Sequence, residues 1–474
     1  MKNSKNITEG NIYKNFIFYA IPLVLSSLLS NLYTAVDTVI AGNFIGEYAL
    51  GAISATSSFE ILFRAFFNGF GLGFSIYVAH LFGKRDFLTL KRDTANTVAL
   101  VMGISIIISA FAICFKSPIM AYLKVDPILK ADADMYFCIL ASSYVFTFVN
   151  FTLLHVLHVL GNTSCSLYVS LGSAILNIGG NLLTVCVFDM GVVGLGLSTV
   201  ASTAAATVIY SIVLRRTLGE LTAEKVPFRF DFSGIGRSSR YTFIVGIQKV
   251  AFCCVGFLIA PMINGMGAEA SAGYNVSTRI YELCSLTILN VTSAMECHTA
   301  QCVGMKSYHK IPRGLRVGVL INSVVLLPIV VTFVAFSNPI VSLFFRDGYD
   351  GAAFEYALRY ASVYIPFLYI HMIDHIMHSY IRSLGKILVV FAVTIFGSVI
   401  RVALTAILVL RINMDGVYLA QVISWSFDAL ISIIVYMLFY RTAEQIKRIV
   451  HSMHFDRTDT VINKKEILKT EGSV

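Results

Sequence analysis

The stretch 215-RRTLGELTAEKVPFRFDFSGIGRSSR-240 lies almost at the middle of the 474-residue chain, and it decides how the rest is divided. It is the longest polar connection between apolar runs, and it is rich in Arg and Lys. Long apolar runs flank it on both sides. The stretch therefore predicts a linker between two halves of similar length.

The composition indicates whether these apolar runs lie in a soluble core or in a membrane. Hydrophobic residues make up 57% of the chain and charged residues only 13%, and the mean hydropathy is +0.76. Soluble globular domains contain about 25% charged residues. The sequence therefore predicts an all-α integral membrane protein rather than a soluble one, because each span needs a run of roughly 20 apolar residues.

Twelve apolar segments are long enough to be transmembrane helices, six on each side of the central stretch. They cover residues 15–40, 48–82, 94–115, 133–160, 164–188, 192–214, 241–264, 269–303, 315–336, 356–384, 387–410 and 416–440. We expect an N-terminal six-helix lobe at 1–214, a cytoplasmic linker at 215–240, a C-terminal lobe at 241–441 and a cytoplasmic tail at 442–474.

The basic residues predict the orientation of the chain. If both termini are cytoplasmic, most of the 36 Lys and Arg residues fall in inner segments, among which Arg382 and Lys386 are counted. This asymmetry fits the positive-inside rule for a plasma (cytoplasmic) membrane protein. It also accounts for the net charge of +9 without a nucleic-acid partner.

The two halves can be overlaid on each other. With an offset of 221 residues, 79-AHLFGKRD-86 aligns with 300-AQCVGMKS-307, and with an offset of 224, 160-LGN-162 aligns with 384-LGK-386. Six helices per half place both halves in the same orientation, so they should be parallel repeats about a pseudo-two-fold axis along the membrane normal. Chance recurrence of small-residue packing patterns is the alternative. Two such lobes would enclose a central cavity, as in a transporter.

Asp37, in 31-NLYTAVDTVIAGNFIG-46, is the sharpest candidate for a functional residue. It lies well inside the first helix with no Lys or Arg within four positions, where an ionised group is costly. It could exchange a proton near physiological pH or coordinate sodium, or it could only bond a neighbouring helix. Asn177 and Asn181 lie one turn apart in the fifth helix and are candidate partners. Pro22 should bend the first helix, either as a hinge or as a static kink.

Several segments resemble signature stretches of the multidrug and toxic compound extrusion (MATE) family. They are 33-YTAVDTVIAGNFIGEYALGA-52, 79-AHLFGKRD-86, 176-LNIGGNLL-183 with 191-GVVGLGLSTVAS-202, and 272-AGYNVSTRIYEL-283 with 300-AQCVGMK-306. The resemblance covers roughly residues 15–440. It implies twelve helices in two lobes and export of cationic or amphipathic organic compounds by antiport with protons or sodium.

The resemblance also implies roles for particular residues. It gives Asp37 the cation-coupling role, with Asn177 and Asn181 beside it. Asn181 stands where some members carry a second acid, so the choice between proton and sodium stays open. The chain also departs from the NorM-like branch, because 244-IVGIQKVAFCCVG-256 offers only Gln248 and Lys249 where that branch has an acid. A sodium site of that kind in the C-terminal lobe is therefore not expected.

The stretch 371-HMIDHIMHSYIRSLGK-386 places His371, Asp374, His375 and His378 on one face of a helix. Three interpretations are open: a polar face lining the cavity, a set of interhelical hydrogen bonds, or a metal site with His-x3-His ligands. The cavity interpretation is favoured, because no ordered partners for a metal's ligands can be identified in the sequence. Tyr33 is expected to line the same cavity.

Other charged residues lie within the predicted helices. Glu60 with Arg64 and Arg279 with Glu282 are expected to be neutralising pairs along their helices, whereas Arg401 has no evident partner. Two other functions compete with efflux. One is a lipid-linked oligosaccharide flippase, which would need several cations in the cavity. The other is a membrane-embedded metalloenzyme using the His and Asp face. We expect no cofactor, no enzymatic activity and a functional monomer in the lipid bilayer.

Overall fold

The computed structural model describes residues 7–122, 128–222, 224, 232–345 and 351–451, and this part of the chain is helical without strands. The first eight helices form the N-lobe. They are α1 (Ile12–Ile40), α2 (Glu47–Lys84), α3 (Phe87–Cys114), α4 (Lys116–Tyr122), α5 (Lys130–Ser142), α6 (Tyr144–Val159), α7 (Thr163–Asn181) and α8 (Gly191–Leu221).

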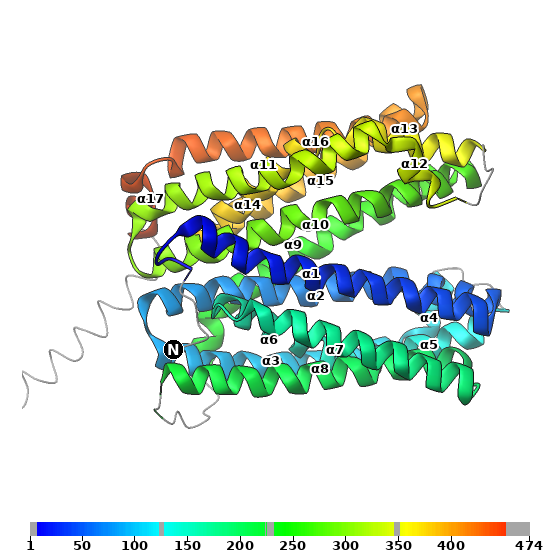
Figure 1. Cartoon of the computed structure of the whole chain (residues 1–474), viewed down its shortest axis with the longest axis horizontal. Coiled ribbons are helices and arrows are strands. Elements are labelled where there is room, and N and C mark those ends of the chain that lie inside the picture. Colours follow the sequence, from blue (N-terminus) through cyan, green and yellow to red (C-terminus); the bar gives the residue numbers. More distant parts are fainter. Residues whose placement is uncertain (1–6, 123–127, 223, 225–231, 346–350, 452–474) are drawn as a thin grey trace, which may run out of the picture.

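The next eight helices form the C-lobe, and a short helix follows it. They are α9 (Phe232–Asn264), α10 (Ala268–Gly304), α11 (Ile311–Ala335), α12 (Ser337–Ser342), α13 (Ala352–Tyr364), α14 (Leu368–Ser383), α15 (Ile387–Ile412), α16 (Met414–Val435) and α17 (Ala443–His451). Figure 1 shows the two lobes side by side, with α1 and α2 next to the C-lobe.

The helices of the structure can be assigned to twelve membrane spans. Within the described residues, nine helices are long and apolar enough to cross a membrane, and α5 with α6, bent by 45°, makes a tenth. The remaining two are α10, which is 37 residues long but more polar, and the broken pair α13 and α14. The expected fold of twelve helices in two six-helix lobes is confirmed.

The backbone itself repeats between the lobes. Four turns with positive φ in the N-lobe recur in the C-lobe at the offsets that overlay the sequences. The pairs are Gly46 (116°) with Gly267 (110°), Arg85 (61°) with Lys306 (58°), Gly161 (80°) with Gly385 (85°), and Asp189 (53°) with Asn413 (51°). Because φ in this region is rare for residues other than Gly, four matched turns are not expected by chance. The small-residue patterns therefore mark a structural repeat.

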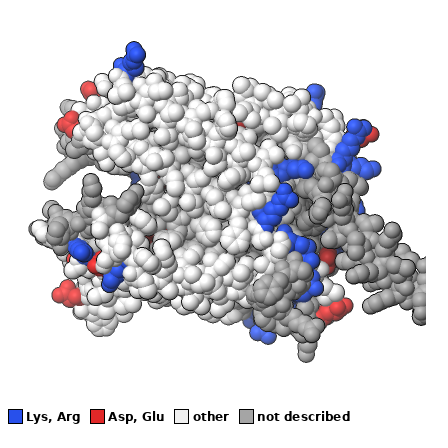
Figure 2. All heavy atoms as spheres, turned by 180° about the vertical axis from the view of Figure 1, so that it is seen from behind, with Lys and Arg blue, Asp and Glu red and all other residues white. Residues whose placement is uncertain are grey.

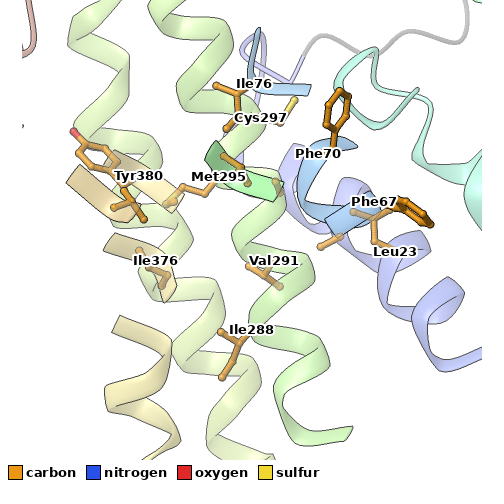
Figure 3. Close-up of a cluster of buried hydrophobic side chains, with 14 of the residues drawn as sticks. Leu23, Phe67, Phe70, Ile76, Ile288, Val291, Met295, Cys297, Ile376 and Tyr380 are labelled. Carbon is orange, nitrogen blue, oxygen red and sulfur yellow. The ribbon is translucent and has the colours of Figure 1, made fainter. Parts of the chain in front are cut away.

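The lobes meet along a buried apolar seam. Helix α2 packs against α9 and α10, and α1 packs against α10. The buried apolar side chains continue from α2 into the C-lobe: Phe70 of α2, Met295 of α10 and Ile376 of α14 are each at most 1% exposed, and Figure 3 shows them on neighbouring helices. The seam holds the lobes together over part of their length and leaves room for a cavity elsewhere.

On the face shown in Figure 2, charged side chains lie mostly at the two ends of the molecule. The belt between these ends is almost free of Lys, Arg, Asp and Glu, and most of the Lys and Arg on this face are at one end. The opposite end is hollowed between the lobes. An uncharged belt is what a membrane-spanning protein presents to lipid.

The central connection is shorter than predicted. Helix α8 continues to Leu221 and α9 begins at Phe232, so helix covers both ends of the 215–240 stretch. Residues 223 and 225–231 of this stretch lie outside the described residues, as does most of the 442–474 tail beyond α17. Arg382 was counted among the basic residues of the inner, cytoplasmic segments, but it lies in the last turn of α14 and is only 3% exposed.

Candidate functional site

A cavity of about 430 Å³ lies between the two lobes. Helices α1, α2, α6, α7 and α8 line it on one side, and α9, α10 and α14 on the other. Tyr33, which was expected to line the cavity, is among these residues. The volume is within the range of sites for small organic molecules, about 300 to 1,000 Å³.

Asp37 and the two asparagines come together inside the N-lobe. Asn181 Nδ2 donates to Asp37 Oδ1 at 2.5 Å and to Asn177 Oδ1 at 3.3 Å, and Asn177 Nδ2 donates to Thr199 Oγ1 at 3.3 Å. Both asparagines are buried and Asp37 is half-buried. The amides hold the carboxylate without neutralising it, so its charge is available to a proton or a cation.

One oxygen beside Asp37 has no partner. Asn181 Oδ1 is buried, and it accepts no hydrogen bond within the described part of the chain. An unpartnered buried acceptor next to a carboxylate is costly unless something occupies it. Hard cations bind to carboxylate and amide oxygens of this kind, and a proton on Asp37 would also bind to such an oxygen.

Irregular turns follow both sides of this site. Helix α1 continues into a π-helical turn at Ala41–Ile45, and α7 continues into another at Leu182–Val187. The two turns pack against each other. Such turns are frequent at functional sites. Pro22 lies inside α1, and its role as a hinge stays a prediction.

The glycines of α7 do not act alike. A side chain at Gly180 would contact Ser198 of α8 at 2.9 Å, whereas nothing lies within 4 Å of one at Gly179. Gly180 therefore permits the close approach of α8, whereas Gly179 does not contact another helix among the described residues.

The polar face of α14 lines a second cavity, of about 300 Å³, inside the C-lobe. All four of its predicted residues line this cavity, and His375 also lines the central one. Tyr281 Oη and His371 Nε2 are 3.0 Å apart. Asp374 Oδ1 and His378 Nε2 are 3.4 Å apart but too poorly aligned for a hydrogen bond. Among the described residues, no three His, Cys, Asp or Glu side chains are disposed to hold a metal ion.

Sequence reasoning missed three features of the C-lobe. Asp428 of α16 is buried and lines the same cavity as Asp374, so two buried acids face this cavity. A side chain at Gly397 would overlap the Asp428 carboxylate. Arg401, expected to lack a partner, donates from Nη2 to Gln421 Oε1 at 2.8 Å.

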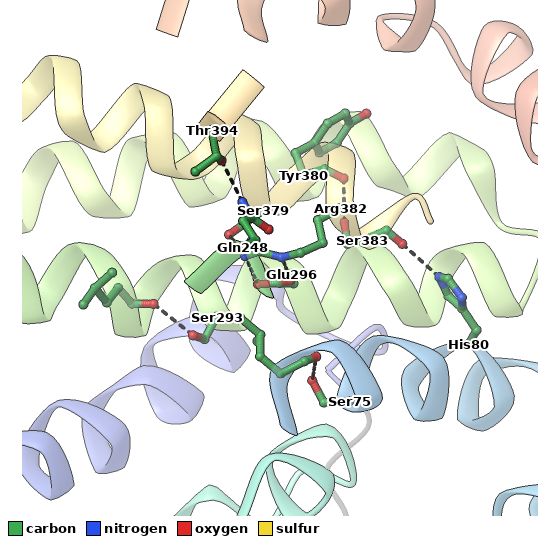
Figure 4. A network of polar contacts seen from close by, with 12 residues as sticks. Ser75, His80, Gln248, Ser293, Glu296, Ser379, Tyr380, Arg382, Ser383 and Thr394 are labelled. Carbon is green, nitrogen blue, oxygen red and sulfur yellow. Dashed lines mark hydrogen bonds and ion pairs between the residues drawn. The ribbon is translucent and has the colours of Figure 1, made fainter. Parts of the chain in front are cut away.

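The third feature is a buried ion pair between α10 and α14. Arg382 Nε donates to Glu296 Oε1 at 2.8 Å, and its Nη2 donates to Glu296 Oε2 at 3.2 Å (Figure 4). Arg382 Nη2 also donates to Ser379 Oγ at 2.9 Å. Both members of the pair line the central cavity. The geometry is that of a bidentate arginine–carboxylate pair, the strongest kind.

The two pairs expected along single helices are present. Arg64 Nη1 lies 3.3 Å from Glu60 Oε1, and Arg279 Nη1 lies 3.2 Å from Glu282 Oε2. Arg64 lines the central cavity, whereas Arg279 is exposed. The charge of Arg64 is therefore already balanced where it faces the cavity.

The lobes close on each other at one end through two matching hydrogen bonds. In α2, the Nε2 atom of His80 is 2.8 Å from the carbonyl oxygen of Ser383. In α10, the Nε2 atom of Gln301 donates to the carbonyl oxygen of Val159 at 2.9 Å. Residues 80 and 301 are equivalent in the repeat, and so are 159 and 383. The contacts are therefore two copies of one interaction, each joining a lobe to the end of a helix in the other.

Two equivalent glycines make this closure possible. A side chain at Gly83 would overlap the carbonyl oxygen of Gln301, and one at Gly304 would overlap that of His80. Helices α2 and α10 therefore touch backbone to backbone at the end of the molecule opposite the hollow.

Comparisons with known proteins agree with this geometry. The family model described as MatE matches residues 22–183 and again residues 245–407, one stretch in each lobe. Two relatives come from Bacillus subtilis (strain 168). The probable multidrug resistance protein YoeA is 22% identical over 350 residues, 72% of this chain and 75% of YoeA. The probable multidrug resistance protein YpnP is 22% identical over 435 residues, 91% of this chain and 96% of YpnP.

A solved structure shows the same fold. A MOP superfamily transporter from Pyrococcus furiosus superposes with a TM-score of 0.86 at 16% identity, covering 94% of this chain and 99% of the other. The two-lobe architecture is thus that of a known transporter.

Proposed function

The chain belongs to the MatE family of multidrug efflux transporters, and we propose that it exports amphipathic organic compounds by alternating access, in antiport with protons or sodium. Members of this family are transporters and not enzymes, so the metalloenzyme alternative is set aside. The observation that carries the proposal is the central cavity, which lies between two lobes that bond to each other at one end and are hollowed apart at the other.

Alternating access needs contacts that close one end and can separate. The hydrogen bonds of His80 and Gln301 are suited to this. Each joins the two lobes, and neither is one of the backbone hydrogen bonds that hold a helix together, so both can break without unfolding a helix. We expect both bonds, with the Gly83 and Gly304 contact, to break when the closed end opens. Rocking of two repeats about a central site is how such folds change access.

Asp37 is the proposed coupling residue. Its carboxylate and the free oxygen of Asn181 can take a proton or a sodium ion, and either would cancel a buried charge. Binding of the ion would then favour one arrangement of the lobes. Coupling of this kind is typically worth about 1 to 3 kcal/mol.

We place the closed, basic end in the cytoplasm, in keeping with the positive-inside rule. Both termini then lie inside, and the hollow faces the outer side of the plasma membrane. A conformation open to the outside is suited to release of an exported compound and capture of the coupling ion.

The flippase alternative is less well supported by the cavity. A pyrophosphate group would need several free cations. Of the cations lining the central cavity, Arg64 and Arg382 are paired, and only Lys249 makes no ion pair with a described residue.

Transport in proteoliposomes tests the proposal. The purified protein would be reconstituted, and efflux of rhodamine 123, ethidium and fluorescein would be followed under an imposed proton or sodium gradient. We expect one of the two gradients to drive transport of at least one dye above the rate of protein-free liposomes. Absence of gradient-driven transport of all three dyes would overturn the proposal.

A further inference from the structure

The charges around the central cavity do not balance. Its charged lining residues are Arg64, Lys249, Glu296 and Arg382. Arg64 is paired with Glu60, and Arg382 is paired with Glu296. Lys249 makes no hydrogen bond or ion pair with any residue that the structure describes. One positive charge is therefore left over, and among the described residues that line this cavity no acid is free to receive a cation.

Lys249 occupies a particular place in the molecule. It projects from α9 at the boundary between the lobes and lines both the central cavity and the C-lobe cavity. A side chain at Gly69 of α2 would meet Lys249 Cγ at 2.8 Å, so the lysine stem lies against the opposite lobe. Asp374 and Asp428 line the C-lobe cavity but are not within ion-pair distance of Lys249 among the described contacts.

Further hydrogen-bonding groups surround the same space. His158 Nε2 and His375 Nδ1 are buried, and each lacks a partner among the described residues although both histidines line the central cavity. Leu72, Phe151, Leu154, Leu286 and Leu289 line it as well, and they offer apolar surface. An ammonium group with unpartnered imidazole nitrogens and apolar walls is a site for an amphipathic anion.

We propose that the central cavity binds an amphipathic organic anion, with its carboxylate, sulfonate or phosphate group on Lys249. The inference rests on the proposed function for its transport step, and it departs from the cationic substrates expected from the sequence. Lys249 is half-buried, and a partly desolvated cation without a paired acid is costly, so an acidic substrate group would supply the missing counter-charge.

Binding of two dyes of one ring system tests the inference. Fluorescein and rhodamine 123 share a xanthene core but carry opposite charge near pH 8. Fluorescence anisotropy with purified protein in nanodiscs would give both dissociation constants. We expect wild type to bind fluorescein more tightly. Lys249→Met should weaken fluorescein at least about tenfold, because a hydrogen bond to a charged group is lost, and should leave rhodamine 123 equal or tighter.

Two variants serve as controls. Lys249→Arg keeps the charge and should bind fluorescein within about threefold of wild type. Lys130→Met removes an exposed lysine of α5 that lines neither cavity, and it should change nothing. Thermal unfolding of each variant would show that it is folded. Tighter binding of rhodamine 123 than of fluorescein by wild type, no binding of fluorescein, or unchanged affinity in Lys249→Met would each overturn the inference.

The same dyes separate this inference from the proposed function. If a gradient drives dye export but Lys249→Met binds fluorescein as tightly as wild type does, the proposed transport function stands and the anion site is wrong. If fluorescein binding depends on Lys249 but no gradient drives transport, the anion site stands and the antiport proposal fails.

Discussion

The interiors of the two lobes differ far more than their backbones do. In the N-lobe, one acid, Asp37, is held by neutral amides of α7. In the C-lobe, Asp374 and Asp428 share a cavity with histidines and with Lys249 and Arg401. Yet the turns of the two lobes match in position and φ, and so do the contacts at the closed end. The repeated backbone thus provides the two similar lobes that move against each other, whereas the charged and polar residues inside each lobe are different.

This comparison predicts that ion coupling belongs to the N-lobe. Asp37→Asn should abolish gradient-driven export, because an amide cannot take up a proton and has no negative charge for a cation to neutralise. Asp428→Asn, a buried acid of the C-lobe, should keep at least about a tenth of the wild-type rate. Both are measured by dye efflux from proteoliposomes, with equal protein in each preparation.

Asp132→Asn is the matched control, since this acid is in the first turn of α5 and lines neither cavity. It should transport as wild type does. If Asp428→Asn is as inactive as Asp37→Asn, coupling is shared between the lobes and the contrast drawn here is wrong.

The ion pairs of the two lobes should differ in stability. Arg382→Met leaves Glu296 buried and uncompensated, which costs about 3 to 5 kcal/mol in such pairs. Arg64→Met breaks a pair that is 42% and 24% exposed, and it should cost about 0 to 1 kcal/mol. Thermal unfolding of the purified variants compares them. The double variant Glu296→Gln, Arg382→Met should recover much of the loss, and no recovery would mean that packing rather than charge explains it.

The Glu296 and Arg382 pair also marks the limit of what the sequence predicts. Helix positions follow from apolar length, and the repeat follows from matched turns such as Gly161 and Gly385, since both signals are local. A pair joining residues 86 positions apart on different helices carries no local signal. Arg382 was counted with the cytoplasmic residues because it stands beside a turn, and only tertiary packing buries it.

Asp428 is a different kind of miss. It is an isolated acid in an apolar segment, as Asp37 is, so the same reasoning could have identified it. The alignment of His371 with Asp374 and His378 was predictable from helical spacing. Which cavity they line was not, because this depends on how α14 packs against α16 and α10.

The contact of Gly83 with Gln301 tests whether the closed end is held by the backbone contacts that both lobes share. Gly83→Ala places a methyl group against the Gln301 carbonyl, and overpacking of this kind costs about 1 to 3 kcal/mol. The closed end should therefore open more often. Cys297 is buried there, with its Sγ 3.8 Å from the carbonyl oxygen of Val159, so its labelling by N-ethylmaleimide reports the opening.

Each 1.4 kcal/mol of destabilisation should speed this labelling about tenfold. Gly103→Ala is the matched control, because nothing lies within 4 Å of the added methyl group in α3. Labelling at the wild-type rate in Gly83→Ala would show that the end does not close through this contact. Gly304→Ala should act like Gly83→Ala if the two lobes are equivalent here.

The smallest effect is expected where the two lobes differ least. His80→Gln gives the N-lobe the residue that the C-lobe has at the equivalent position, and Gln301 already bonds a helix-end carbonyl from there at 2.9 Å. Dye export and Cys297 labelling should therefore stay within about threefold of wild type between pH 6 and 8. His80→Leu cannot donate to Ser383, and loss of that bond should cost about 1 kcal/mol. If His80→Gln is as impaired as His80→Leu, the imidazole itself is required, and the two closing contacts are not copies of one interaction.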